Sequence, residues 1–240
     1  MVRRWCFMLA ALATGVAAGG PAMARNVDVA LVLAVDVSGS VNGERFELQR
    51  QGYAKAFTSP EVLGAIASGP NHAILVTLVE WSGSEHQQQT IGWTVIDGPA
   101  AAERFGSAVA EAPRAFADWT SISGAIDYAV KLLATVDAQP TRKVIDVSGD
   151  GINNNGRDLA AARAEALATG LTINGLPILW DYPELDTYYR DNVIGGPGAF
   201  AVVAHDFGDF GNALLGKLVR EIAGTDPLRR YAETGLQPMP

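Results

Sequence analysis

A near-continuous apolar run from Val27 to Val37 constrains the fold of this 240-residue chain more than any other segment. Such a run lacks the alternation of apolar and polar residues that marks a half-exposed strand, and it is typical of a strand buried on both faces of a parallel sheet. Two more apolar runs, His72–Trp81 and Lys143–Ser148, have the same character. Together they predict the buried strands of a mostly parallel sheet.

Helical patterns separate these runs. The predicted helices cover Gly43–Thr58, Ile122–Leu133, Leu159–Leu167 and Phe210–Ile222. Each repeats its apolar residues at the spacing of one helical face, and Gly170 stands in the C′ position after the third helix. The sequence thus predicts buried strands that alternate with amphipathic helices.

Three further strands complete the prediction, and they cover Gln87–Ile96, Leu171–Ile173 and Phe200–Ala204. The first is the most polar and follows a short turn, so we expect it at an edge of the sheet. Alternating strands and helices of these lengths predict a single α/β domain with a mostly parallel sheet. The segment Trp180–Gly198 fits neither pattern and is interpreted as a long surface excursion.

The N-terminus resembles a secretory signal peptide. Arg3 and Arg4 precede the apolar run Trp5–Ala18, and Ala22-Met23-Ala24 supplies a cleavage site. We therefore expect a signal peptide at residues 1–24, a domain at 25–224 and a loosely ordered tail at 225–240. The apolar run is shorter than the roughly 20 residues of a membrane-spanning helix, so no membrane span is expected after cleavage.

Cleavage changes what chemistry the chain carries. Cys6 is the one cysteine, so the mature chain offers neither a disulfide nor thiol chemistry. The formal net charge of −8 becomes −10 once Arg3 and Arg4 are removed. An acidic surface of this size disfavours nucleic acid and anionic membranes as partners, and mildly favours cations.

Oxygen-bearing side chains follow two of the buried strands. The first strand ends in Asp36-Val37-Ser38-Gly39-Ser40, and the strand Lys143–Ser148 leads into Gly149-Asp150-Gly151. Ligand sites of open α/β sheets lie at the carboxyl ends of the strands, where both segments are expected. Thr120 stands just before a predicted helix, where its hydroxyl either caps that helix or points into the same crevice. These carboxylates and hydroxyls are hard oxygen donors, which suit Mg²⁺, Mn²⁺ or Ca²⁺ rather than zinc.

Asp36-x-Ser38-x-Ser40, Thr120 and Asp150-Gly151 resemble, in order and approximate spacing, the metal-ion-dependent adhesion site of von Willebrand factor A domains. The resemblance covers about Val27 to Ala223. It implies a Rossmann-like fold with helices on both faces of the sheet, one antiparallel edge strand, and the two carboxylate-bearing strands as neighbours. The whole chain also resembles an uncharacterised group of exported bacterial proteins with such domains.

The resemblance also implies roles for the site residues. Ser38, Ser40 and at times Thr120 would ligate the ion directly, and Asp36 and Asp150 would act mainly through bound waters. One coordination position would remain for an acidic side chain of a protein partner, and Mg²⁺ is the expected ion. The chain departs from the family pattern at Asp118-Trp119, where two glycines are common, and at Gly149, where threonine is frequent.

Other residues carry weaker signals. Asp150-Gly-Ile-Asn-Asn-Asn-Gly fails the EF-hand pattern at its third position, so its asparagines are interpreted as a turn. His205 lies near the ligand edge of the sheet but is expected to be structural or exposed. Glu80 ends a strand at that edge and is not expected to reach the ion. The aromatics Trp180, Tyr182, Tyr188 and Tyr189 either form a recognition surface or pack the excursion onto the domain.

Three functions fit these features. The leading hypothesis is an exported binding module, periplasmic or secreted, whose metal bridges to a carboxylate on a protein partner. The second is a hydrolase in which the metal activates water for attack on a phosphate or ester. The sequence contains no Gly-x-Ser-x-Gly, His-Glu-x-x-His or Asp-x-Asp motif, so no enzyme activity is expected. The third is a metal that only stabilises the fold. The oligomeric state stays open.

Overall fold

The computed structural model describes residues 24–224. The expected signal peptide, apart from Ala24, and the expected tail at 225–240 lie outside the described residues. The strands are β1 (Arg25–Asp36), β2 (Ile74–Trp81), β3 (Gln87–Ile96), β4 (Ala138–Gly149) and β5 (Thr172–Pro177). The helices are α1 (Gly43–Phe57), α2 (Pro60–Ser68), α3 (Pro99–Glu111), α4 (Ile122–Ala134), α5 (Leu159–Ala168), α6 (Leu185–Tyr188), the π-helix η1 (Tyr189–Val193) and α7 (Phe210–Ala223).

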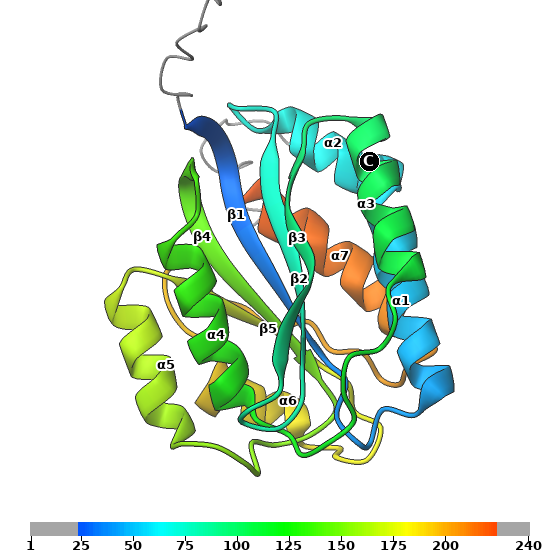
Figure 1. Ribbon diagram of the computed structural model, residues 1–240, viewed down its shortest axis with the longest axis vertical. Coiled ribbons are helices and arrows are strands. Elements are labelled where there is room, and N and C mark those ends of the chain that lie inside the picture. The colour runs from blue at the N-terminus through cyan, green and yellow to red at the C-terminus, as the bar shows by residue number, and fades with distance from the viewer. Residues whose placement is uncertain (1–23, 225–240) are drawn as a thin grey trace, which may run out of the picture.

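The strands form one twisted sheet in the order β3-β2-β1-β4-β5 (Figure 1). β1, β2, β4 and β5 are parallel, and β3 pairs antiparallel with β2 at the edge, as predicted. The central strand β1 is buried on both faces: Leu31 and Leu33 point into one core, and Ala30 and Val32 into the other. This double burial explains why its sequence shows no polar alternation.

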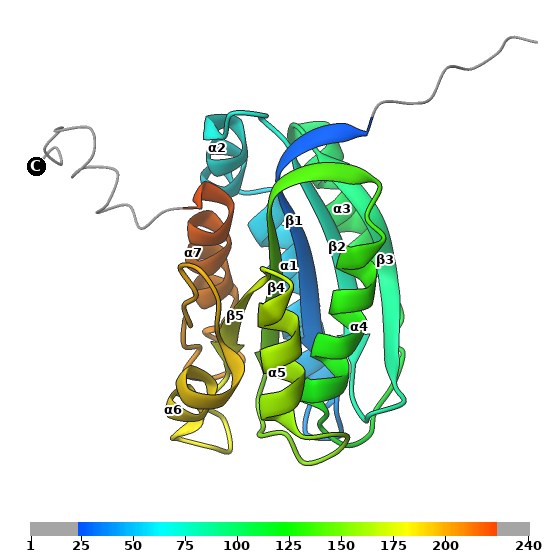
Figure 2. The ribbon, with the colours of Figure 1, turned by 90° about the vertical axis from the view of Figure 1, so that its left-hand side faces the viewer.

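Helices cover both faces of the sheet, as Figure 2 shows in the view turned by 90°. α1, α2, α3 and α7 pack on one face, and α4 and α5 pack on the other. The result is the three-layer α/β arrangement that the alternating pattern predicts. Gly170 follows α5 with φ +81°, in the left-handed conformation expected of a glycine at C′.

Several elements differ from the prediction. α2 and α3 were not predicted; both begin with a proline in the first turn, Pro60 and Pro99. The predicted strand Phe200–Ala204 is wrong. This segment runs along β5 through isolated bridges alone, Gly175 with Ala201 and Ile178 with Ala204, and no regular ladder forms.

The segment Trp180–Gly198 was expected to be a surface excursion, but part of it is buried. It contains α6 and η1, whose side chains Leu185, Tyr189 and Val193 are fully buried against the face that carries α4 and α5. A backbone bridge between Ile173 and Gly195 fastens its far end to β5. The apolar residues of this segment therefore extend the core and cover the open edge of the sheet.

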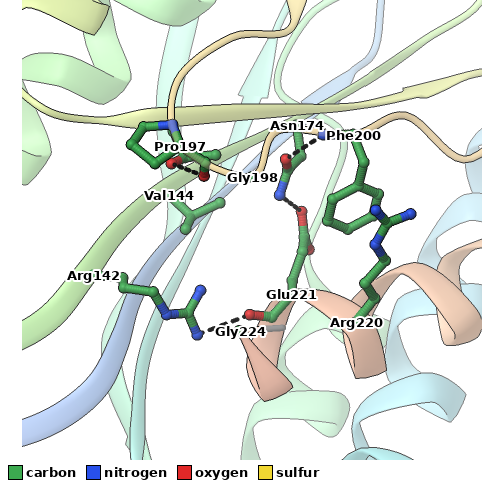
Figure 3. A pocket seen from close by; sticks show the side chains of 10 residues that line it. Arg142, Val144, Asn174, Pro197, Gly198, Phe200, Arg220, Glu221 and Gly224 are labelled. Carbon is green, nitrogen blue, oxygen red and sulfur yellow. Dashed lines mark hydrogen bonds between the residues drawn. The ribbon is translucent and has the colours of Figure 1, made fainter. Parts of the chain in front are cut away.

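A buried ionic cluster holds α7 against the sheet. The ammonium of Lys217 pairs with the carboxylates of Asp146 on β4 and Glu221 on α7, and all three side chains are buried. Asn174 on β5 donates to Glu221 at 2.9 Å. A cavity of about 190 Å³ lies beside this cluster, between the C-terminal end of α7 and the early halves of β4 and β5 (Figure 3). Breaking such a pair would leave an uncompensated buried charge, so the cluster fixes the position of α7.

Within residues 24–224 no helix is both long and apolar enough to cross a bilayer.

Candidate metal centre

The two carboxylates of the site arrive on neighbouring parallel strands. β1 pairs with β4 in a register that sets Val35 opposite Ser148, so both chains leave the sheet at the same edge. Asp36 is the last residue of β1, and Asp150 follows the last residue of β4. Both side chains are buried. The strand order thus places the two acids side by side, as the resemblance to von Willebrand factor A domains implied.

A chain of hydrogen bonds joins the residues of the motif. The backbone N–H of Ser38 donates to Asp36 Oδ1 at 2.7 Å, which folds the loop after β1 back over that carboxylate. The Oγ atoms of Ser38 and Ser40 lie 3.1 Å apart. The hydroxyl of Ser40 then donates to Asp150 Oδ1 at 2.6 Å. Four of the five predicted site residues therefore lie in one connected group.

Thr120 is the fifth predicted residue, and it lines the same crevice as Ser40 and Asp150. The sequence left open whether its hydroxyl caps α4. In the structure Ser121 is the N-cap, and its side chain accepts from the N–H of Gly124. Thr120 is therefore not needed as a cap, and it lies in the crevice on the side of Gly151.

The site disfavours the charged forms of its own acids. Asp36 Oδ2 and Asp150 Oδ2 are buried and have no hydrogen-bond partner among the described residues. Burial, and secondarily the charge of Asp150, raises the pKa of Asp36 from 3.8 to about 7. Burial also raises the pKa of Asp150, although the Ser40 hydroxyl and the guanidinium of Arg45 act in the opposite direction. Two desolvated carboxylates this close need a cation to be stable as anions.

These residues fit a hard divalent cation. The group offers two carboxylates, each with an unpartnered oxygen, and three hydroxyls, all of which are oxygen donors. Nowhere in residues 24–224 do three or more His, Cys, Asp or Glu side chains gather into a possible metal site. A site here must therefore use the serine and threonine hydroxyls as well as the acids. Arg45 Nη1 lies 4.0 Å from Asp150 Oδ2 and partly offsets the negative charge.

The run Asn153-Asn154-Asn155, interpreted from the sequence as a turn, also clamps two other segments, the start of α4 and the turn between β2 and β3. Each side-chain oxygen accepts from a backbone N–H elsewhere in the chain: Asn153 from Ser123, Asn154 from Thr120 and Asn155 from Ser84. The backbone N–H of Asn154 also donates to the carbonyl of Thr120 at 2.9 Å. The loop after Asp150 thus holds Thr120 from both sides.

Arg114 and Glu80 fasten a second loop to the site, and no motif indicates this role for Arg114. Its guanidinium donates to the carbonyls of Val37 and Ser38. Buried Glu80 accepts from the N–H of Ala115 at 2.7 Å. As expected, Glu80 does not join the hydrogen-bonded group of the site. Its role is to fix the loop that leads to Thr120.

The departures at Asp118-Trp119 lie on the rim. Both residues line the crevice with Ser40 and Asp150, and the carbonyl of Asp118 accepts from the N–H of Gly39 at 2.7 Å. The side chain of Asp118 pairs with His86, with Oδ2 and Nδ1 3.0 Å apart. Trp119 is exposed. The rim therefore carries a histidine–aspartate contact and an indole where the family commonly has glycines.

Gly149 has a steric reason to be glycine. A Cβ at this position would lie 2.8 Å from Asp36 Oδ2 and 3.0 Å from the hydroxyl of Tyr189. That hydroxyl is buried with no hydrogen-bond partner in the described part of the chain. The buried tyrosine and Asp36 therefore occupy the space that a larger side chain before Asp150 would need.

The remaining predictions concern His205 and the aromatic residues of the segment Trp180–Gly198. His205 is exposed and does not line the crevice, as expected. Among the aromatics, Tyr189 is fully buried, whereas Trp180 and Tyr182 are exposed. The hydroxyl of Tyr188 accepts from the N–H of Asn153 at 3.2 Å and links the excursion to the loop after Asp150. Tyr188 and Tyr189 therefore pack the excursion onto the domain, whereas Trp180 and Tyr182 stay exposed.

Comparisons with known proteins agree with this geometry. A family model described as "Protein of unknown function (DUF1194)" matches residues 26–226. No curated protein matches the chain. Among solved structures, the von Willebrand factor domain of the type V pili tip protein Mfa5 from Porphyromonas gingivalis is similar at 11% identity and a TM-score of 0.56. The match covers 89% of this chain and 98% of that one.

Two further similar structures contain a metal. One is proximal thread matrix protein 1 from the mussel byssus with zinc in its adhesion motif, at 14% identity and a TM-score of 0.57. This match covers 84% of the present chain and 50% of the mussel chain, so it spans half of that protein. The other is the manganese-loaded TRAP protein of Plasmodium vivax, at 15% identity and a TM-score of 0.53, with 82% and 73% covered. At these identities the likeness shows the fold.

Proposed function

The chain belongs to the family described as "Protein of unknown function (DUF1194)" and has the fold of a von Willebrand factor A domain, and we propose that it is an exported, metal-dependent binding module. The module holds one divalent cation through Asp36, Ser38, Ser40, Thr120 and Asp150. Through that cation it recognises an acidic group on a protein partner.

The observation that carries this proposal is the hydrogen-bonded group Asp36–Ser38–Ser40–Asp150. It places two buried carboxylates, each with one unpartnered oxygen, around two serine hydroxyls. A purely structural cluster would leave fewer buried acceptors unsatisfied, because each unpaired oxygen costs free energy. A cation satisfies them together.

Each residue has a role in this proposal. Ser38, Ser40 and Thr120 contact the ion directly, and Asp36 and Asp150 hold it mainly through waters and neutralise its charge. The bound cation supplies a positive charge with one position open to a carboxylate. Asp36 also accepts from the Ser38 N–H, and Asn154 brackets Thr120, so the chain orients its hydroxyls before the ion arrives.

Magnesium is the proposed ion, with Mn²⁺ or Ca²⁺ as alternatives, because every donor is a hard oxygen. The zinc-occupied mussel protein and the manganese-loaded TRAP protein support a divalent cation in this fold. The pilus tip protein among the similar structures supports an exported location, for which we propose the periplasm.

A metal-assisted hydrolase is the second candidate, and one observation favours it. His86 pairs with Asp118 on the rim of the crevice, so an imidazole lies near the site. A hydrolase predicts metal-dependent cleavage of p-nitrophenyl phosphate or acetate that falls at least tenfold in His86→Gln. The binding proposal predicts no such cleavage.

The test of the binding proposal is water-proton relaxation with Mn²⁺. A bound Mn²⁺ that keeps an open position enhances relaxation, and a carboxylate that occupies the position reduces the enhancement. We expect acetate to lower the enhancement saturably, and acetamide to leave it unchanged. Enhancement that acetate does not alter would contradict a ligand role and favour a metal that only stabilises the fold.

A further inference from the structure

Large exposed apolar side chains gather around the candidate metal centre. In the described part of the chain five such residues are exposed: Leu48 37%, Trp119 63%, Ile152 37%, Trp180 50% and Tyr182 46%. All except Leu48 belong to the loops at the carboxyl ends of the strands. Trp119 and Tyr182 line the crevice with Asp150, and Ile152 follows Asp150 by two residues. Exposed apolar side chains that cluster in this way mark interaction surfaces.

Trp180 belongs to the same surface through Arg45. The guanidinium of Arg45 stacks over the indole at 4.6 Å from the ring centroid, and its Nη1 lies 4.0 Å from Asp150 Oδ2. The guanidinium of Arg45 also lies over the ring of Phe207, 5.3 Å from its centroid. The indole is therefore held beside the metal centre.

A pocket of about 450 Å³ opens in this surface next to the crevice. Its apolar wall is formed by Ile152, Tyr182, Leu185 and Tyr188. The volume lies in the range of pockets that hold small ligands, roughly 300–1,000 Å³, so it has room for a large side chain. Tyr182 lines both the pocket and the crevice, so the two are adjacent.

The charges around the pocket restrict what fits it. Glu184 and Asp191 both line the pocket. A second carboxylate on a partner would be repelled here, whereas an apolar side chain with a nearby basic group would be accommodated.

We propose that this pocket is the specificity subsite of the module. It receives the large apolar side chain of a protein segment whose single carboxylate binds the metal, with a basic residue close by. The inference rests on the proposed function, since the metal fixes the carboxylate. It adds that the residue next to that carboxylate, rather than the carboxylate alone, selects the partner.

The probe is a set of capped hexapeptides, titrated into the magnesium-loaded protein and followed by NMR chemical shifts. The parent peptide is Gly-Gly-Asp-Phe-Lys-Gly, and a second peptide has the Phe before the Asp. Replacing Phe by Ala tests the pocket, and replacing Asp by Asn tests the metal. We expect the Phe peptide to bind about tenfold more tightly than its Ala counterpart, in whichever of the two sequence orders binds better.

Ile152→Ser is the test variant, and Leu48→Ser is its matched control, because both residues are 37% exposed. Metal binding should be the same in both variants. The preference for Phe over Ala should disappear in Ile152→Ser and persist in Leu48→Ser. That pattern would establish the subsite.

Other outcomes overturn the inference. If Asp peptides bind better than Asn peptides but Phe and Ala bind alike, the metal proposal stands and the subsite is wrong. If Asp and Asn peptides bind alike, or none binds, the proposed carboxylate recognition itself fails. An acidic oligosaccharide whose binding exceeds that of every peptide and depends on Ile152 would exclude a protein segment as occupant.

Discussion

Ser40 and Asp150, 110 residues apart in the sequence, are joined by a hydrogen bond of 2.6 Å from the serine hydroxyl to the carboxylate. The bond crosses from the loop after β1 to the loop after β4, and it is possible because the two strands are parallel neighbours. In the metal-free protein this bond and the nearby Arg45 are what hold the Asp150 carboxylate. The stability of the domain should therefore depend on how its two acids are neutralised.

The pH dependence of stability tests this directly. The folded-state pKa of Asp36, about 7, lies above its ordinary value of 3.8, so the unfolded chain releases this proton first. The free energy of unfolding of the metal-free protein should therefore fall as pH rises from about 4 to about 7. Metal affinity should rise over the same pH range, because fewer protons compete with the ion for the Asp36 carboxylate.

The variant Asp36→Asn isolates this effect from Glu221, whose pKa burial also raises. In EDTA at pH 8, urea denaturation should show the variant about 1–3 kcal/mol more stable than the wild type. At pH 4 the two should be nearly equal. A variant that is less stable than the wild type at pH 8 would show that Asp36 is well stabilised as an anion without a metal.

The fit around Gly149 predicts a second effect. Gly149→Ala places a Cβ against Asp36 Oδ2 and the Tyr189 hydroxyl, so we expect a loss of about 1–3 kcal/mol in stability and weaker metal binding. Gly149→Ala combined with Tyr189→Phe should recover part of the lost stability and part of the lost metal affinity, because the contact with the Tyr189 hydroxyl is removed. The control is Gly64→Ala, where a Cβ meets nothing within 4 Å. Thermal unfolding and metal titration of the four proteins check the prediction, which fails if Gly149→Ala behaves like the control.

The asparagine clamp gives a third prediction. Asn154→Ala removes the acceptor of the Thr120 N–H, so Thr120 is no longer held from both sides. We expect roughly tenfold weaker metal binding, as for other groups that orient a metal ligand. Asn212→Ala, at an exposed position on α7, is the control. Equal metal affinities for the two variants would show that Thr120 does not need the clamp or does not bind the ion.

Much of the fold follows from the sequence for identifiable reasons. The run Val27–Val37 is apolar because β1 is covered on both faces, and Gln87–Ile96 is more polar because β3 is an edge strand. Parallel strands end at one edge, so Asp36 and Asp150 had to meet there once β1 and β4 were neighbours. The resemblance supplied that neighbour relationship, since the pattern of apolar residues does not give strand order.

The clamps of the site depend on side-chain contacts that no periodicity reveals. Asn153 and Asn154 accept from the start of α4, and Asn155 accepts from the turn between β2 and β3, whereas composition alone suggested a turn. Arg114 lies in a stretch without secondary structure and donates to the carbonyls of Val37 and Ser38 in the loop after β1. Tyr189 is buried because η1 packs against β5. The local sequence around Tyr189 therefore does not distinguish it from Tyr182, which is exposed.

The central claim is that Ser38 and Ser40 hold a divalent cation between the two carboxylates. Calorimetric titration of Mg²⁺, Mn²⁺ and Ca²⁺ into the metal-free protein tests it most directly, alongside the double variant Ser38→Ala, Ser40→Ala. Ser107→Ala, at an exposed position on α3, is the matched control. We expect one ion per chain in the wild type and the control, and at least a hundredfold weaker binding in the double variant. Absence of binding in the wild type, or equal binding in the double variant, would contradict it.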